Sequence, residues 1–182
     1  MTSPNPLPRT ASRVVLRRLR VDDLADFQAY RSDEAVGLYQ GWTPMPDTEA
    51  AAFLEKMADA TFFQPGEWFQ FGIADPKTDT LIGDIGICVS SSPSQAEIGF
   101  SLRAPSQGLG LGAEAVSEAI AFVFDQTAVQ KVIAITDARN LACVRMLERL
   151  GLRRDSESKA MFLGEPCVEY TYTAQRPSDA PG

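Results

Sequence analysis

Histidine is absent from all 182 residues of this chain. Its absence excludes a Ser-His-Asp triad, a Cys-His nucleophile pair and the zinc sites that depend on imidazole ligands. Any proton transfer must therefore use a carboxylate, a tyrosine, a cysteine, a lysine, a chain terminus or water.

Cysteine is scarce, and the three present, Cys88, Cys143 and Cys167, lie far apart in the sequence. An odd number of widely spaced cysteines predicts reduced thiols, not a disulfide framework or a metal knuckle, so we expect no bound metal. The chain also lacks a run of roughly 18 apolar residues, and its start has neither the basic nor the apolar part of a signal peptide. We therefore expect a cytoplasmic protein with no membrane partner.

The charge balance is acidic, with a formal net charge of −7. This charge argues against a nucleic-acid partner and mildly favours a cationic substrate. The length of the chain and its hydrophobic content of 45% fit one globular domain with a sizeable core. We place that domain at residues 11–174, between loose tails at 1–10 and 175–182 that are rich in proline and small residues.

Turn residues and hydrophobic periodicity divide the domain into strands and helices. Strands are predicted near residues 14–19, 68–74, 81–89, 96–102, 131–136, 161–163 and 167–173, and helices near 22–30, 47–58, 112–126 and 140–150. Gly151 follows the last helix as its C-cap. This order predicts an α/β protein, with a mixed sheet and helices on both of its faces.

Residues 106–115 carry three alternating glycines, Gly108, Gly110 and Gly112, and lead directly into an apolar-periodic helix. Glycines there leave backbone N–H groups bare at the positive end of a helix dipole, which is a site for an anion such as phosphate. A P-loop is disfavoured because no lysine lies between positions 77 and 131. A dinucleotide fold is disfavoured because its glycine turn should follow a strand directly. The pyrophosphate of coenzyme A is the third possibility.

Residues 107–112, Gln-Gly-Leu-Gly-Leu-Gly, fit the Gln/Arg-x-x-Gly-x-Gly/Ala loop of the GNAT superfamily of N-acetyltransferases, which the chain resembles. Residues 140–152 are similar to that family's Asn-x-x-Ser…Glu-Lys-Leu-Gly-Phe helix, and residues 15–23 resemble its opening strand and helix start. Residues 81–87 and 96–100 are typical of the RimJ/RimL-type branch, which includes ribosomal-protein and other amine acetyltransferases. The motifs occur in the family's order along most of the chain.

The resemblance implies acetyl-CoA as the donor and direct transfer in a ternary complex. It also implies a central, mostly antiparallel sheet in which two neighbouring strands splay apart to admit the pantetheine. The cofactor-binding residues carried over are Phe100, Ser101, Leu102, Gln107, Gly108, Leu109, Gly110, Leu111, Gly112, Ala113 and Asn140. A backbone N–H near Phe100 would polarise the thioester carbonyl, while Asn140 has the plainer alternative role of a helix N-cap.

The attacking amine must lose a proton, and Glu97 is our first candidate for the base, three residues before the position expected to hold the acetyl group. Asp84 is the second candidate, and for both the plainer alternative is a strand carboxylate that is solvated or ion-paired. Cys143 stands where the family often has serine, so it can protonate the departing thiolate or serve only as a small buried helix residue. Leu147 replaces the tyrosine that many members use as general acid, which leaves Cys143 or water for that step.

The acceptor side is expected within residues 30–68, where five aromatic side chains either line an amine pocket or pack in the core. These are Tyr39, Trp42, Phe62, Phe63 and Trp68. Two functions of different class follow. One is an N-acetyltransferase acting on the primary amine of a protein N-terminus, an aminoglycoside or a polyamine, and the other is a non-catalytic module that binds acyl-CoA. The resemblance also makes a homodimer an expectation.

Overall fold

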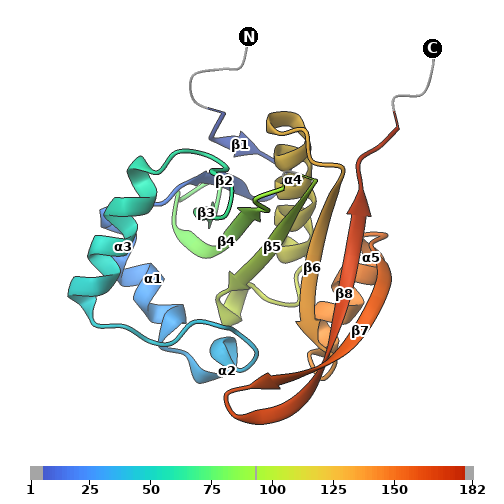
Figure 1. Ribbon diagram of the computed structural model, residues 1–182. Coiled ribbons are helices and arrows are strands. Elements are labelled where there is room, and N and C mark those ends of the chain that lie inside the picture. The colour runs from blue at the N-terminus through green and yellow to red at the C-terminus, as the bar shows by residue number, and fades with distance from the viewer. Residues whose placement is uncertain (1–5, 93, 179–182) are drawn as a thin grey trace.

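The computed structural model describes residues 6–92 and 94–178, which contain one eight-stranded sheet (Figure 1). Its strands stand in the order β1-β2-β3-β4-β5-β6-β8-β7. They are β1 (Arg9–Thr10), β2 (Val15–Arg18), β3 (Trp68–Ala74), β4 (Leu81–Val89), β5 (Gln95–Leu102), β6 (Lys131–Asp137), β7 (Arg153–Phe162) and β8 (Glu165–Gln175). Only β5 and β6 pair in parallel among these strands, so the predicted mostly antiparallel mixed sheet is confirmed.

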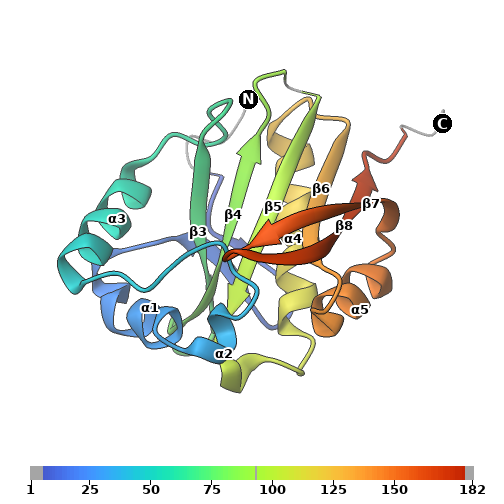
Figure 2. The ribbon, with the colours of Figure 1, turned by 60° about the horizontal axis from the view of Figure 1, so that its bottom comes forward.

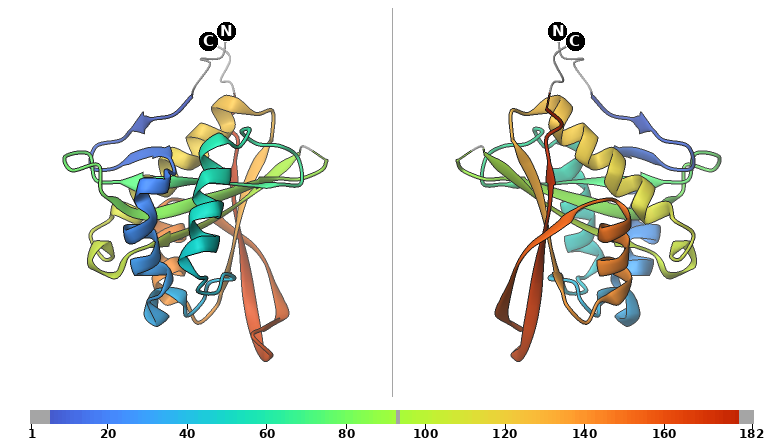
Figure 3. Two further views of the ribbon diagram at one scale, coloured as in Figure 1. Left: turned by 90° about the vertical axis from the view of Figure 1, so that its left-hand side faces the viewer. Right: turned by 90° about the vertical axis from the view of Figure 1, so that its right-hand side faces the viewer.

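Helices cover both faces of the sheet, with α1 and α3 on one side and α4 and α5 on the other (Figure 3). The helices are α1 (Leu24–Arg31), α2 (Glu34–Gly37), α3 (Asp47–Asp59), α4 (Leu111–Gln126) and α5 (Leu141–Arg149). Short 3-10 turns occur at Val21–Asp23 and Ala104–Ser106. The prediction of helices on both faces is therefore confirmed.

Each face of the sheet has its own hydrophobic core, because successive strand residues point to opposite sides. On the side of α4, the rings of Phe122 and Phe71 meet edge to face at 5.7 Å. On the other side, Phe27 of α1 and Leu54 of α3 pack with Leu81 of β4. Burial on both faces explains why β4 reads as a nearly continuous apolar run in the sequence.

The β5–β6 pair is short and then opens. The parallel pairing runs from Gln95 and Lys131 to Glu97 and Ile133, and beyond it the two strands separate (Figure 2). A parallel pair needs a long crossover connection, and here the crossover contains residues 107–110, which we call the glycine loop, and α4. The fold therefore delivers the start of α4 next to the opening between the two strands.

Strand structure extends past residues 11–174 at both ends. Residues Arg9–Thr10 form β1 rather than part of a tail, and Arg9 forms ion pairs with Glu118 (2.6 Å) and Asp125 (2.9 Å) of α4. At the other end, Arg176 donates to backbone carbonyls near the C-terminus of α4, where a cation is favoured. Composition alone suggested loose ends because it does not reveal such long-range arginine contacts. Residues 1–5 and 179–182 of the predicted tails lie outside the described residues.

The C-terminal hairpin is longer than its sequence indicates. β7 begins at Arg153, although strand structure was expected only from residue 161. β7 is almost entirely exposed and polar on both faces, so it lacks the alternation that identifies a half-buried strand. The turn is made by Leu163 and Gly164, both with positive φ, as a two-residue hairpin turn of type I′ requires.

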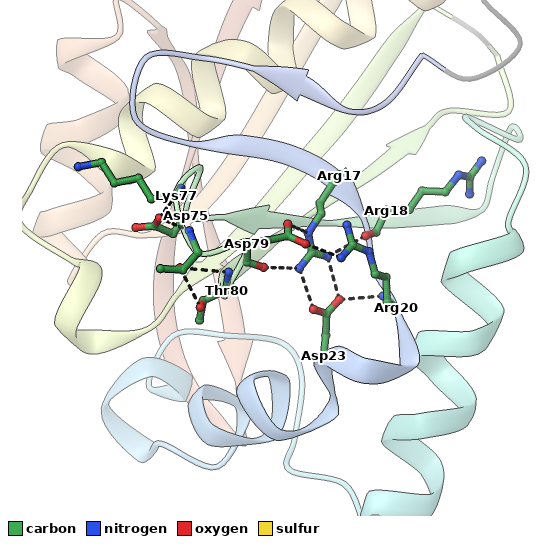
Figure 4. A network of polar contacts seen from close by, with 9 residues as sticks. Arg17, Arg18, Arg20, Asp23, Asp75, Lys77, Asp79 and Thr80 are labelled. Carbon is green, nitrogen blue, oxygen red and sulfur yellow. Dashed lines mark hydrogen bonds and ion pairs between the residues drawn. The ribbon is translucent and has the colours of Figure 1, made fainter.

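A buried arginine ties the start of the chain to the β3–β4 turn (Figure 4). Arg17 of β2 forms ion pairs with Asp23 (2.8 Å) and with Asp79 (2.7 Å). Asp23 occupies the N-cap position of α1, yet its carboxylate makes no capping bond to that helix and accepts from Arg17 and from the Arg20 N–H instead. These contacts fix the path of the chain from β2 into α1.

Replacing Arg17 with methionine is expected to lower the free energy of unfolding by about 3 kcal/mol, because Asp23 would keep a buried charge without its partner. Urea denaturation measures this loss. The matched control is Arg153→Met, which removes an exposed guanidinium from its pair with Asp155 and should cost less than about 0.5 kcal/mol. Equally small losses of unfolding free energy in both variants would contradict the stabilising role of the buried Arg17–Asp23 pair.

Candidate active site

A cleft of about 500 Å³ lies where α2, β5, the glycine loop and α5 meet. It brings together most of the predicted cofactor residues from segments that are separate in the sequence. Its lining includes Phe100, Ser101, Leu102, Gln107, Gly108, Gly110, Gly112, Ala113, Asn140 and Cys143. Leu109 of the glycine loop and Leu111, the first residue of α4, do not line the cleft, and Leu109 is exposed.

The backbone of β5 presents a free edge to this cleft. The Arg103 N–H donates to the Ile82 carbonyl at 2.8 Å. In an antiparallel pair the backbone groups of every second residue bond to the neighbouring strand, so in β5 the odd-numbered residues bond to β4. The N–H and C=O groups of Phe100 and Leu102 therefore point away from β4. The ladder to β6 has already ended at this height. The edge is thus available to an extended ligand that can form strand-like hydrogen bonds.

Two glutamine side chains already contact this edge. Gln40 Nε2 donates to the Phe100 carbonyl at 3.2 Å, and Gln107 Nε2 donates to the Leu102 carbonyl at 2.8 Å. Gln107 was predicted as a cofactor residue, whereas Gln40 was missed. No motif pointed to Gln40, because it lies in the irregular segment between α2 and α3.

The glycine loop has the backbone conformation of an anion site. Gly108 (φ 73°) and Gly110 (φ 79°) adopt the left-handed region, which side chains other than glycine enter at a cost. Gly110 is the N-cap of α4 and supplies no side-chain cap, so the first N–H groups of the helix have no capping side chain. Arg13 braces the loop by donating to the Leu109 carbonyl (2.8 Å) and pairing with Glu114 (2.9 Å). Chemically, this loop can hold a phosphate against the helix dipole.

α5 contributes Asn140 and Cys143. The Asn140 side chain accepts from the Cys143 N–H at 3.2 Å, so it is a helix N-cap, and it also lines the cleft. Burial raises the pKa of the Cys143 thiol above its ordinary value, with Thr136 acting in the opposite direction. A thiol with a raised pKa stays protonated at neutral pH and can donate a proton. Leu147, at the family's tyrosine position, is fully buried in the core.

Glu97 lies on β5 with its side chain half-buried, directly opposite Cys88 of β4. Burial raises the pKa of its carboxyl, and the negative charge of Glu169 raises it further. Glu97 shares its face of the sheet with Gly99 and Ser101. A side chain at Gly99 would meet nothing within 4 Å, so the sheet surface beside Glu97 is open.

Asp84 occupies a different environment, because it is buried and fully engaged. Its oxygens accept from Arg31 (2.8 and 2.9 Å), from the Tyr30 hydroxyl and from Gln70 (3.1 Å). The Arg31 guanidinium stacks on the Trp42 ring at 4.5 Å. An acidic residue within an apolar strand needs a buried cation, yet the sequence does not indicate which arginine supplies it.

The five candidate aromatic residues fall into different groups. Tyr39 lines the cleft, and Trp42 Nε1 donates to the Ser101 hydroxyl at 3.0 Å. Phe62 and Phe63 pack in the main core, which is the plainer of the two alternatives. Trp68 is partly exposed and lies over Gly86.

A model of the acetyltransferase (GNAT) domain matches residues 13–153. The chain belongs to this family, and its predicted enzyme class, N-acetyltransferase, is confirmed.

Individual relatives agree with this membership. An uncharacterized N-acetyltransferase of Bacillus licheniformis, p20, is 28% identical over 151 residues, which cover 80% of this chain and 84% of the relative. A GNAT-family acetyltransferase from Bacillus anthracis shares the fold with a TM-score of 0.81 and 21% identity, covering 93% of this chain and 98% of that one. RimL, described as a ribosomal L7/L12 α-N-protein acetyltransferase in complex with coenzyme A, has a TM-score of 0.78 and 13% identity, covering 92% and 96%. RimL thus shares the fold of this chain.

Two further properties concern residues 6–92 and 94–178. Within them, none of the helices combines the length and apolar character needed to cross a bilayer. The same residues contain no group of three or more metal-ligating side chains placed to hold an ion.

Proposed function

We propose that this protein transfers the acetyl group of acetyl-CoA directly to a primary amine in a ternary complex. The observation that carries the proposal is the convergence of the open edge of β5, the glycine loop and α5 on one cleft. The glycine loop and the start of α4 would hold the pyrophosphate. The Phe100 carbonyl and the N–H and C=O groups of Leu102 would pair with the pantetheine, with Asn140 beside it.

In this mechanism a neutral amine attacks the thioester carbon while the Phe100 N–H stabilises the developing oxyanion. The tetrahedral intermediate collapses by breaking the C–S bond, which leaves an amide and the CoA thiolate. Cys143 donates its proton to that thiolate, since its thiol lines the cleft and is protonated at neutral pH. The Cys143 thiolate is then reprotonated from solvent.

We assign the removal of the amine proton to Glu97, directly or through one water. Its carboxylate lies beside the open surface at Gly99, on the strand that would hold the thioester. Asp84 is a less suitable base because Arg31, Tyr30 and Gln70 already occupy its oxygens. We give Asp84 a positioning role, in which it holds Arg31 beneath Trp42.

The acceptor is proposed to be cationic before it reacts, as the net charge of −7 and the carboxylates of Glu97 and Glu169 favour. A structural neighbour that acetylates a protein α-amine makes protein N-termini one class to test, beside polyamines and aminoglycosides. The three free cysteines support the expectation of a cytoplasmic protein.

The test is release of free CoA thiol from acetyl-CoA in the presence of an amine panel. The panel contains a peptide with a free N-terminus, spermidine and an aminoglycoside, and the N-acetylated form of the same peptide is the control. Thiol release with at least one amine, and not with the acetylated peptide, is the expected result. Tight CoA binding without transfer to any amine would favour the alternative, a non-catalytic CoA-binding module.

A further inference from the structure

Gln40 belongs to residues 38–46, the segment that leads from α2 to α3 and that crosses the cleft edge of β5. Its carboxamide donates to the Phe100 carbonyl at 3.2 Å, and its side chain lines the cleft. Phe100 is one of the even-numbered residues of β5, so its carbonyl points away from β4 and into the cleft. A side-chain amide therefore already fills the position at which an extended ligand would form a strand-like bond.

The segment does not depend on the hydrogen bond from Gln40, because other contacts hold it in place. Two residues further on, Trp42 Nε1 donates to the Ser101 hydroxyl (3.0 Å), and the Trp42 ring stacks on Arg31 (4.5 Å). At its far end, the segment is held by Gln28, which donates to the Met45 carbonyl at 2.7 Å. On the side of α2, the Gln40 backbone N–H donates to the Gly37 carbonyl at 3.0 Å. Release of the Gln40 carboxamide would thus leave the segment anchored on both sides.

We propose that Gln40 is a displaceable stand-in for the cofactor's own amide. In the empty cleft its carboxamide satisfies the Phe100 carbonyl, and on binding, an amide N–H of the pantetheine takes over that acceptor. A carbonyl oxygen can accept two hydrogen bonds. The competition therefore requires that the arm and the Gln40 side chain, which lines the same cleft, exclude each other. This inference rests on the proposed function, and it adds that the protein carries a built-in competitor for the donor.

Competition of this kind lowers the affinity of the cleft for both acetyl-CoA and CoA. The bond to Gln40 forms again whenever the arm leaves, so it assists the departure of the product CoA. A cofactor ligand would have the opposite effect, because its removal weakens binding. The two roles therefore predict changes of opposite sign for the same substitution.

The decisive experiment is calorimetric titration of CoA into Gln40→Leu, which keeps the side-chain bulk and removes the amide donor. We expect the Kd for CoA to fall about fivefold, the factor that corresponds to the net contribution of one neutral hydrogen bond. Gln40→Ala, which also removes the bulk, should bind at least as tightly. The matched control is Gln28→Leu, which loosens the same segment at its other end and should leave the Kd unchanged.

Thermal melting provides a second reading. The bond exists only in the empty protein, so Gln40→Leu should lower the melting temperature without CoA and leave it equal to that of the unaltered protein at saturating CoA. An unchanged or raised Kd in Gln40→Leu would overturn the inference, and so would an equal fall in Gln28→Leu. Failure of the unaltered protein to bind CoA would instead reject the proposed function itself, and this inference with it.

Discussion

Replacing Glu97 with glutamine is expected to lower kcat by about 1,000-fold, within the range that a positioned general base contributes. The substitution removes the proton acceptor and keeps the size of the side chain. Burial and the charge of Glu169 raise the pKa of Glu97. Because only the ionised carboxylate can act as base, the rate of the unaltered enzyme should climb as pH rises through that raised pKa. Initial rates of thiol release at saturating acetyl-CoA, measured as a function of pH, test this.

Glu169→Gln is the matched control for this prediction, since it removes the neighbouring charge and leaves Glu97 in place. The pKa of Glu97 should then fall, so the rising limb of kcat/KM should move to lower pH. The Kd for CoA should be unchanged in Glu97→Gln if the residue acts only in proton transfer. Rates that are the same in Glu97→Gln and the unaltered protein across the pH range would remove Glu97 from the mechanism.

Introducing aspartate at Gly108 is expected to weaken CoA binding about 200-fold. A carboxylate about 5 Å from a pyrophosphate charge, at an effective dielectric constant near 20, is repelled by about 3 kcal/mol. A Cβ at Gly108 meets nothing within 4 Å, so the effect does not depend on a steric clash. Calorimetric titration of CoA measures it, and added salt should reduce the loss.

Two controls separate charge from backbone strain in this prediction. Gly108→Asn has nearly the same shape and tolerates the left-handed region, without the charge. Gly164→Asp places the same carboxylate at another left-handed glycine, in the β7–β8 turn. Both should bind CoA within a few-fold of the unaltered protein. If Gly108→Asn lost as much affinity as Gly108→Asp, strain and not an anion site would explain the result.

Much of the fold could be predicted because its strands are buried in recognisable ways. β3, β4 and β5 carry apolar runs bounded by turn residues, and α4 has a clear apolar face. Most of β7, residues 153–160, could not be predicted, because these residues are exposed and mostly polar and their strand conformation depends on pairing with β8. β1 consists of only Arg9–Thr10 and is held by ion pairs with α4, which no local pattern reveals.

The candidate site could likewise be predicted in part. The glycine loop and the edge of β5 could be predicted because both act through the backbone, and glycine spacing and strand alternation indicate backbone conformation. The partners of Asp84 could not be predicted, because Arg31 and Gln70 are distant from it in the sequence and come close only in the folded chain. Gln40 was missed for a similar reason, because it acts through a side chain in an irregular segment.

The parallel β5–β6 pair, with the glycine loop and α4 in its crossover, has a consequence for how this enzyme can diversify. The groups proposed to hold the donor all lie between residues 95 and 149, as one continuous stretch of chain. Most of the groups proposed to meet the acceptor come from the earlier residues 30–68. The groups proposed for the donor and most of those proposed for the acceptor thus come from separate parts of the polypeptide. Exchanging the earlier part between relatives should change the amine that is accepted and preserve the donor.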